Sequence, residues 1–329
     1  MTDPITAKTR ARPGSNRIPG YVIVTPARNE AAVLEETIQS VAAQTHLPLR
    51  WVIVSDGSTD GTDDLVRKYA AQHSWMELVR MPERKERNFA GKVHAFNAGY
   101  GRVRDLPYQF IVGMDADISF EPDYFEFLLA KAAADSRLGV VGTAFREGRM
   151  SYDYRYVSIE HVSGPCQVFR RECFEDIGGY VPVRGGGVDH IAVLTARMKG
   201  WKTRTYTEKL YQHRDMGSAK HGPVGYKFNI GRLDYALGSH PLWEVFRAVY
   251  QLGKKPYVVG GIMIGAGYLA AALKRIERPI SSDLVRFRRR EQMARLKRLL
   301  GRSSASAEIP DSRPGNEKPT RPVSANPHP

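Results

Sequence analysis

Tyr108-Gln-Phe-Ile-Val-Gly-Met-Asp-Ala-Asp117 places two carboxylates, one residue apart, directly after a short apolar run. Carboxylates at the carboxyl end of a buried strand face the crevice in which open α/β sheets bind their ligands. Mg²⁺ and Mn²⁺ prefer hard oxygen ligands, and Mg²⁺ usually takes one or two carboxylates and completes its shell with water and substrate phosphates. Asp115 and Asp117 therefore predict a metal-bridged phosphate ligand, although an Asp-x-Asp triplet taken alone usually marks a turn.

Strand and helix patterns alternate on the N-terminal side of these aspartates. Strands are predicted at 21–25, 50–55 and 76–81, and helices at 30–44, 62–72 and 91–104. In the first predicted helix, apolar residues recur at helical spacing at positions 33, 34, 38 and 41. This order predicts an α/β fold with a doubly wound, mostly parallel sheet that carries helices on both faces.

The length and composition indicate one catalytic domain with appendages. A chain of 329 residues, 42% hydrophobic and 26% charged, is long and apolar enough to bury a substantial core. Residues 1–19 and 301–329 are polar, lack apolar periodicity and are predicted to be disordered tails. Because the N-terminus lacks a signal-peptide core and only Cys166 and Cys173 are present, we expect a cytosolic body without a disulfide scaffold.

The formal net charge of +14 indicates an anionic partner, and the basic residues concentrate near the C-terminus. No interleaved stacking aromatics or zinc ligands accompany them, so nucleic acid is not the predicted partner. They follow the uncharged segment 256–273, and an anionic membrane surface fits this order better. The basic residues are Lys274, Arg275, Arg278, Arg286, Arg288, Arg289, Arg290, Arg295, Lys297, Arg298 and Arg302.

Residues suited to a nucleotide follow the other predicted strands. Asp56 stands at a strand end, where its carboxylate can accept hydrogen bonds from a nucleoside, and Gly57 permits close backbone approach. The following residues, 58–60, are predicted to cap the next helix. Lys92 stands at a predicted helix start, where its ammonium and the helix N-terminus can both meet a diphosphate, although a lone lysine there is more often solvated.

Four motifs together resemble the family 2 glycosyltransferases of GT-A fold. They are Pro-Ala-Arg-Asn-Glu at 26–30, Asp-Gly-Ser-Thr-Asp-Gly-Thr at 56–62, Gly-Lys-x-x-Ala-x-Asn at 91–97 and Asp-Ala-Asp at 115–117. Their order and spacing agree with that family over roughly 21–215. The resemblance implies transfer of one sugar from a nucleotide-sugar, usually a UDP-sugar, with inversion at the anomeric carbon.

The same resemblance implies a role for each matching position. Pro26, Arg28 and Glu30 are expected to line the nucleoside pocket, and Asp56 to contact the uracil. Lys92 is expected to contact the uracil or the diphosphate. Asp115 is expected to contact the ribose and a divalent metal, Mg²⁺ or Mn²⁺, and Asp117 the metal itself.

The second half of the chain supplies the predicted acceptor side. The segment 164–180 resembles the family's small-residue turn, expected at Gly164 to contact the donor sugar and the acceptor, followed by a helix that ends at paired glycines. A glycine run at 185–187 then leads into a helix that carries Asp189 in its first turn. The family places its catalytic base in a Glu-Asp pair here, and this chain has Val188-Asp189, so the Glu is missing and Asp189 remains the expected base. The alternative is that Asp189 is a helix N-cap.

Two residues further on are candidates for the same site. His213 and Arg214 are predicted to contact the diphosphate or the acceptor, with a solvated basic loop as the alternative. Polysaccharide synthases of the family typically carry Gln-x-x-Arg-Trp, whereas here Gln212 is followed by Asp215 and Met216 at the matching places. This departure favours transfer of a single sugar over processive chain synthesis.

The predicted organisation is a GT-A catalytic domain over 20–218 and a helical, membrane-associating extension over 219–300. The segment 256–273 is about 27 Å long as a helix and is flanked by cations on both sides, so we expect a re-entrant or interfacial segment. A single transmembrane span and a core helix packed on the catalytic domain are the alternatives. A basic amphipathic helix over 284–300 is expected to lie on the membrane.

Membrane contact favours an acceptor sugar linked to a polyprenyl lipid, on the cytoplasmic face of the plasma membrane. Two other functions stay open. A sugar nucleotidyltransferase also uses metal-binding aspartates, but it ordinarily has a glycine-rich loop after the first strand, which Thr25-Pro-Ala-Arg-Asn-Glu30 is not. A non-catalytic, glycosyltransferase-like subunit of a membrane assembly would tolerate the missing Glu at position 188.

Overall fold

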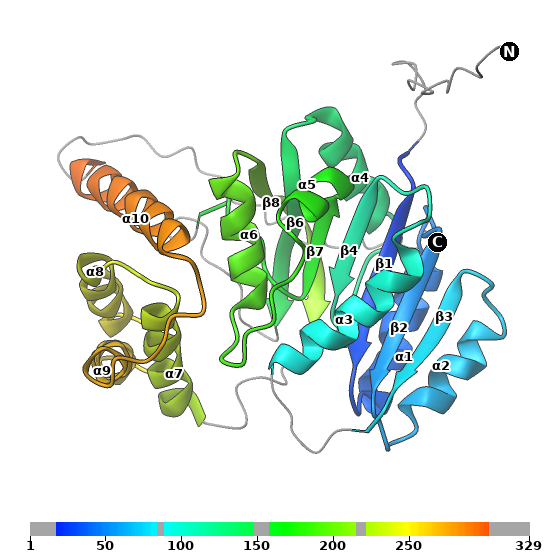
Figure 1. The fold of residues 1–329 in the computed structure, drawn as a ribbon, viewed down its shortest axis with the longest axis horizontal. Coiled ribbons are helices and arrows are strands. Elements are labelled where there is room, and N and C mark those ends of the chain that lie inside the picture. The colour runs from blue at the N-terminus through cyan, green and yellow to red at the C-terminus, as the bar shows by residue number, and fades with distance from the viewer. Residues whose placement is uncertain (1–17, 84–88, 148–157, 215–221, 303–329) are drawn as a thin grey trace, which may run out of the picture.

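The computed structural model describes residues 18–83, 89–147, 158–214 and 222–302, which fold into a central sheet with helices on both faces and a separate group of helices at one end (Figure 1). The strands are β1 (Tyr21–Ala27), β2 (Arg50–Asp56), β3 (Met76–Met81), β4 (Phe110–Met114), β5 (Ile118–Ser119), β6 (Leu138–Glu147), β7 (Cys166–Arg170) and β8 (Lys202–His213). The helices are α1 (Ala31–Ala42), α2 (Thr62–Ala70), α3 (Phe89–Val103), α4 (Tyr124–Ala134), α5 (Arg171–Asp176), α6 (Val188–Met198), α7 (Gly222–Ala236), α8 (Pro241–Leu252), α9 (Val259–Leu273) and α10 (Ser282–Arg302).

The eight strands form one sheet in the order β3-β2-β1-β4-β7-β6-β8-β5. The first four strands in that order pair in parallel, which confirms the doubly wound arrangement predicted for the N-terminal half. The second half is more mixed, because β7 runs antiparallel to both β4 and β6, and β5 runs antiparallel to β8. The alternation of strands and helices that predicts parallel pairing is present only in the first half of the chain.

Alternate residues of β1 divide the hydrophobic core into two layers. Tyr21 and Ile23 pack with α1 and α4 on one face, and Val22 and Val24 pack with α3 on the other. All four side chains are fully buried, as expected of a central strand covered on both faces. Because side chains alternate between the two faces of the sheet, the strand register decides which face each side chain points to. This also holds at the strand ends that carry the candidate site.

The helices α7 to α10 form a layer beyond α6, at the opposite end of the sheet from β3 (Figure 1). Helices α7 and α9 cross closely through glycines, because a Cβ at Gly231 or Gly267 would lie about 2 Å from a backbone carbonyl oxygen of the other helix. Helix α10 contacts α6 and α8, and its Leu284 joins a cluster with Ile191 and Leu194 of α6. The apolar face of α10 is thus covered by protein, so the expectation that 284–300 lies on a membrane is wrong for that face.

The predicted extension is helical from α7 onward, and its predicted boundary at 218/219 falls outside the described residues. Most of the two predicted tails also lies outside them, although α10 continues to Arg302. In the part of the chain that the structure describes, every helix is too short or too polar to cross a bilayer. The segment predicted as re-entrant or interfacial contains α9, which packs on α7 and α8.

Candidate active site

Lys92 and Asp115 form an ion pair at the carboxyl end of the central strand β4. Asp115 directly follows Met114, the last residue of β4, and its backbone N–H donates a 2.8 Å hydrogen bond to the carbonyl of Pro165. Partial removal from water opposes the Lys92 charge, but the attraction of Asp115, and then of Asp189 and Asp117, outweighs it and raises the pKa of Lys92. Lys92 therefore remains a cation that points at the strand end.

Asp115 itself has a raised pKa. Burial of the carboxyl is the largest cause, Lys92 opposes the rise, and the charge of Asp117 adds to it. The two carboxylates of the Asp-x-Asp motif thus repel each other in a partly dry place, and additional positive charge would relieve that repulsion.

Hydrogen bonds between the two loops that follow β1 and β2 join them into one unit. The Asn29 side chain accepts a 2.9 Å hydrogen bond from the N–H of Thr59, and the Asn29 N–H donates to the hydroxyl of Ser58. Asp60 accepts hydrogen bonds from the N–H groups of Ala31 and Thr62, at the starts of α1 and α2. The predicted capping by residues 58–60 thus occurs through Asp60, which caps two helices, while Ser58 binds the neighbouring loop.

Three candidate nucleoside residues lie at this pair of loops. Arg28 lies 3.9 Å from the buried carboxylate of Asp56, measured between Nη1 and Oδ2. Glu30 is the N-cap residue of α1, and its N–H donates a 2.9 Å hydrogen bond to the hydroxyl of Thr62. Gly57 has a φ of +68°, and a Cβ there would meet the backbone of Glu83 at 2.6 Å, so the close approach predicted for this glycine is made to its own chain.

The short strand β5 brings the end of β8 to the Asp-x-Asp motif. Ile118 pairs with His213 in antiparallel register, and the N–H of Arg214 donates to the carbonyl of Asp117 over 3.2 Å. His213 Nε2 lies 3.5 Å from Asp117 Oδ2. Burial opposes the charged imidazole, but the hydrogen bond and charge of Asp117 outweigh it and raise the pKa of His213. The Arg214 guanidinium pairs with Glu36 of α1.

Asp189 lies in the first turn of α6 and packs over Gly164. A Cβ on Gly164 would lie 2.5 Å from Asp189 Oδ2, so this contact requires glycine. The N-cap of α6 is Gly187, with a φ of +81° and no side-chain cap hydrogen bond, and the N-cap alternative for Asp189 is therefore wrong. Within the described residues, neither a hydrogen bond nor an ion pair reaches the Asp189 carboxylate.

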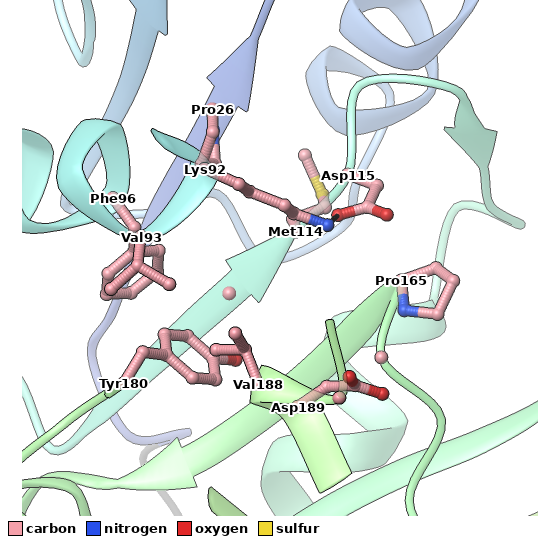
Figure 2. A pocket seen from close by; sticks show the side chains of 13 residues that line it. Pro26, Lys92, Val93, Phe96, Met114, Asp115, Pro165, Tyr180, Val188 and Asp189 are labelled. Atoms are coloured by element: carbon pink, nitrogen blue, oxygen red, sulfur yellow. Dashed lines mark hydrogen bonds and ion pairs between the residues drawn. The ribbon is translucent and has the colours of Figure 1, made fainter. Parts of the chain in front are cut away.

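One cavity of about 190 Å³ joins these elements. Figure 2 shows Lys92 and Asp115 on one side of it and Tyr180 and Asp189 on the other. Of the sequence-predicted site residues, Pro26, Lys92, Asp115, Gly164 and Asp189 line the cavity. The other predicted residues, Arg28, Glu30, Asp56, Asp117, His213 and Arg214, lie outside that lining, at the neighbouring strand ends.

Sequence reasoning missed Tyr180 and the buried Gln167 beneath the cavity. The Tyr180 hydroxyl donates a 2.8 Å hydrogen bond to Gln167 Oε1, and Gln167 Nε2 donates to the carbonyls of Val162 and Asp189. A Cβ on Gly113 would lie 2.5 Å from the Tyr180 hydroxyl oxygen. A glycine inside an otherwise bulky buried strand indicates such a close approach, so Gly113 was the available signal.

Metal-binding capacity at the site rests on few side chains. The described residues contain no group of three or more His, Cys, Asp and Glu side chains arranged to hold a metal ion. Asp115 and Asp117 nevertheless lie together at one strand end, each beside a cationic partner, Lys92 and His213. This donor set fits a hard divalent ion whose remaining ligands come from a bound diphosphate and water, and does not fit an ion held by protein alone.

Comparison with known families decides the class of this domain. Residues 22–181 match the family model described as glycosyl transferase family 2. The matched residues include the strand ends with Pro26, Asp56, Asp115 and Gly164, and they stop before Asp189.

Curated proteins that are similar to part of this chain include two named glycan-forming or sugar-transferring enzymes. A poly-beta-1,6-N-acetyl-D-glucosamine synthase of Staphylococcus aureus is 25% identical over 126 residues, which are 38% of this chain and 28% of the synthase. A validoxylamine A glucosyltransferase of Streptomyces hygroscopicus subsp. limoneus is 29% identical over 141 residues, 42% of this chain and 29% of that enzyme. The chain thus matches less than a third of the length of either curated relative.

Solved structures show the GT-A fold. A mannosyltransferase from Pyrobaculum calidifontis, in complex with GDP-Man and Mn²⁺, superposes with a TM-score of 0.53 at 22% identity, covering 86% of this chain and 81% of the mannosyltransferase. The GT-A fold predicted from the four motifs is confirmed, and the likeness extends beyond the residues that the family model matches.

Proposed function

We propose that the chain is an inverting glycosyltransferase that moves one sugar from a nucleotide-sugar, in the first instance a UDP-sugar, to a hydroxyl of a glycan acceptor in exopolysaccharide or cell-envelope glycan synthesis. The observation that carries this proposal is the single cavity with the Lys92–Asp115 pair on one wall and the Asp189 carboxylate on the other. A donor diphosphate on the first wall leaves the sugar between the walls, within reach of an acceptor beside Asp189.

Asp189 is the proposed base. An acceptor hydroxyl loses its proton to the Asp189 carboxylate as its oxygen forms a bond to the anomeric carbon. The bond from that carbon to the diphosphate oxygen breaks on the opposite face, so the configuration inverts and the nucleoside diphosphate leaves. The absence of a competing partner for Asp189 within the described residues supports this role, because a carboxylate already paired to a cation is a weaker proton acceptor.

A divalent ion, Mg²⁺ or Mn²⁺, is proposed at Asp117 and Asp115. When bound, it stabilises the negative charge that develops on the departing diphosphate. Lys92 supplies a fixed positive charge to the same oxygens, which is worth more in a partly dry cleft than in water. A mannosyltransferase of the same fold has been solved in complex with GDP-Man and Mn²⁺, which supports the use of a divalent metal.

The nucleoside is proposed to lie against the joined loops after β1 and β2. Asp56 is buried at the end of β2 and faces Arg28, so its carboxylate is held where a base edge can reach it. Pro26 and Glu30 flank the same place. His213 is proposed as an additional diphosphate contact, whereas the pairing of Arg214 with Glu36 favours a role in holding the end of β8.

We further propose that the acceptor is lipid-linked and that the chain acts at the cytoplasmic face of the plasma membrane as a peripheral or monotopic protein. The concentration of positive charge in the C-terminal helices supports this. A single transfer is favoured over processive synthesis by Gln212 and the residues after it, although Asp215 and Met216 lie outside the described residues.

Release of free nucleoside diphosphate from a panel of UDP-sugars and GDP-mannose, with Mn²⁺ and with chelator, tests the proposal. Metal-dependent release of UDP is expected from one donor, rising when a suitable lipid-linked acceptor is added. A sugar nucleotidyltransferase would instead release pyrophosphate from a nucleoside triphosphate and a sugar phosphate. A non-catalytic subunit would release neither product, and that result would refute the proposed activity.

A further inference from the structure

Helix α8 has its polar side chains inside and its apolar side chains outside. Glu244 is only 3% exposed, and Arg247 of the same helix pairs with the buried Asp234 of α7. In contrast, Leu242, Val245 and Val249, spaced three and four residues apart, are 57%, 61% and 61% exposed. A helix at a water-exposed surface has the opposite arrangement, so the outer face of α8 is built for an apolar environment.

Helix α9 adds a second exposed apolar stripe. Its inner face is made of glycine and small residues, with Gly267 against Phe228 of α7 and Gly261 against Ala248 of α8. Its outer residues Ile262, Leu269 and Leu273 are 59%, 58% and 76% exposed. Helices α8 and α9 lie side by side at the outer end of the molecule, with α7 on the side of the sheet (Figure 1).

The charges that border the two stripes are mostly positive, with Glu277 as an exposed acidic residue after α9. Lys254 and Lys255 are exposed in the turn between α8 and α9, and Lys274 and Arg275 are exposed where α9 ends. The sequence from 245 to 276 contains no Asp or Glu. An apolar surface with cations at both ends of its helix is the pattern of a segment that lies in a membrane interface.

We propose that the α8–α9 face, defined as Leu242, Val245, Val249, Ile262, Leu269 and Leu273 with its flanking lysines, docks flat on an anionic lipid bilayer. At 15 residues, α9 is about 22 Å long, shorter than the roughly 30 Å hydrocarbon core, so it lies in the interface. The stripes are aliphatic and cations predominate at their border, whereas the cores of protein interfaces favour aromatic side chains.

This inference rests on the proposed action at a membrane, because it names the surface by which the domain reaches a lipid-linked acceptor. It also replaces α10 as the expected contact. The buried residues of α10, including Leu284 and Arg288, pack on α6 and α7. Helix α10 therefore supports the helical layer that carries the α8–α9 face.

Co-sedimentation of the full chain with vesicles tests the proposal. We expect binding to vesicles that contain phosphatidylglycerol and weak binding to pure phosphatidylcholine. The double change Val245→Glu, Val249→Glu should lower the partition coefficient at least about tenfold, because two charges replace apolar contacts. Changing Lys254 and Lys255 to Gln should lower it about fivefold for each charge, and only on anionic vesicles.

Leu47→Glu is the matched control, because Leu47 is 42% exposed on the catalytic domain far from α8 in the sequence. It should bind vesicles as the unchanged chain does. Equal loss in the control and in the Val245/Val249 variant, or no loss in either, overturns the proposal. So does a size measurement showing that the unchanged chain is a dimer and the variant a monomer, since the face would then be covered by a second copy.

Donor turnover without vesicles separates this inference from the proposed activity. The Val245/Val249 variant should release UDP in vesicle-free buffer at the rate of the unchanged chain, which also shows that it is folded. If no donor turns over while vesicle binding follows the expected pattern, the proposed activity fails and the docking surface stands. If turnover is normal and vesicle binding is absent, the docking surface fails alone.

Discussion

The carboxylates on the two sides of the candidate site differ in whether a basic side chain lies beside them. On the donor wall, Asp115 pairs with Lys92. Outside the cavity lining, at the neighbouring strand ends, Asp56 lies beside Arg28 and Asp117 lies beside His213. On the acceptor wall, Asp189 has no such partner within the described residues. Pairing fixes the geometry of a carboxylate and prepares it to bind cations or donors, whereas an unpaired carboxylate is available to take a proton. Under the proposed function, the contrast separates the residues proposed to bind the donor from the residue proposed to accept the proton.

The strongest test of this contrast is Asp189→Asn. The amide keeps the shape of the side chain but cannot accept the hydroxyl proton, so transfer should fall about a thousandfold. Binding of UDP, measured by calorimetry with Mn²⁺, should stay within about twofold of the unchanged chain, because Asp189 lies on the opposite wall. Turnover equal to that of the unchanged chain would refute the assignment of the base.

The second test removes a charge from the donor wall. Asp117→Ala should weaken Mn²⁺-dependent UDP binding about a hundredfold, because the proposed ion loses one of its two carboxylates. Binding measured with chelator should change little. If Asp117→Ala binds UDP and Mn²⁺ normally but loses transfer, it behaves as expected for Asp189→Asn. That result would refute the proposed metal-binding role of Asp117.

A subtler test moves the base without removing it. Gly164→Ala puts a methyl group 2.5 Å from the present position of Asp189 Oδ2, so the carboxylate must shift. We expect kcat to fall about tenfold with the KM for the donor unchanged, because a displaced base loses alignment. Gly101→Ala is the matched control, since a Cβ there meets no described atom within 4 Å. Equal kcat and KM values in the two variants would show that Gly164 does not position the Asp189 carboxylate.

The smallest effect on activity is expected from a carboxyl that belongs to neither wall. Burial, and then the charge of Asp234, raise the pKa of Glu244 to about 8, so the folded chain keeps this group protonated at pH values where the unfolded chain has released the proton. Its contribution to stability is complete below about pH 4.5 and is lost as the pH rises through about 8.

Glu244→Gln should remove this pH dependence and leave UDP release unchanged. Relative to the variant, the Tm of the unchanged chain should fall by about 5 °C between acidic and mildly alkaline buffer. Parallel Tm curves for the two chains across this range would show that the carboxyl does not titrate as its burial implies.

The placement of the donor-side residues was predictable because Asp56 and Asp115 lie at strand ends and Lys92 lies near the start of a helix. The apolar runs located β1, β2 and β4, and the carboxyl ends of parallel strands meet at one edge, so Asp56, Lys92 and Asp115 followed from local patterns. The register of β1 against β2 and β4 confirms the predicted parallel arrangement of these strands.

The remaining parts depend on contacts between distant segments, which local patterns do not contain. The two-residue strand β5 brings His213 to Asp117 and is too short to recognise from periodicity. The contact of Asp189 with Gly164 is made between α6 and the turn that precedes β7, and neither residue indicates its partner. Helix α10 was predicted as a membrane contact because its basic residues dominate the sequence, whereas Arg288 is buried against Asp234.

The hydrogen bonds that join Asn29 and Ala31 with Ser58, Thr59 and Asp60 have a practical consequence for enzyme engineering. The loops after β1 and β2 share their hydrogen-bonding groups, so exchanging one of them for the loop of a relative leaves donors and acceptors of the other without partners. A redesign of nucleotide preference should therefore transplant 26–31 and 56–62 together, as one module of two segments.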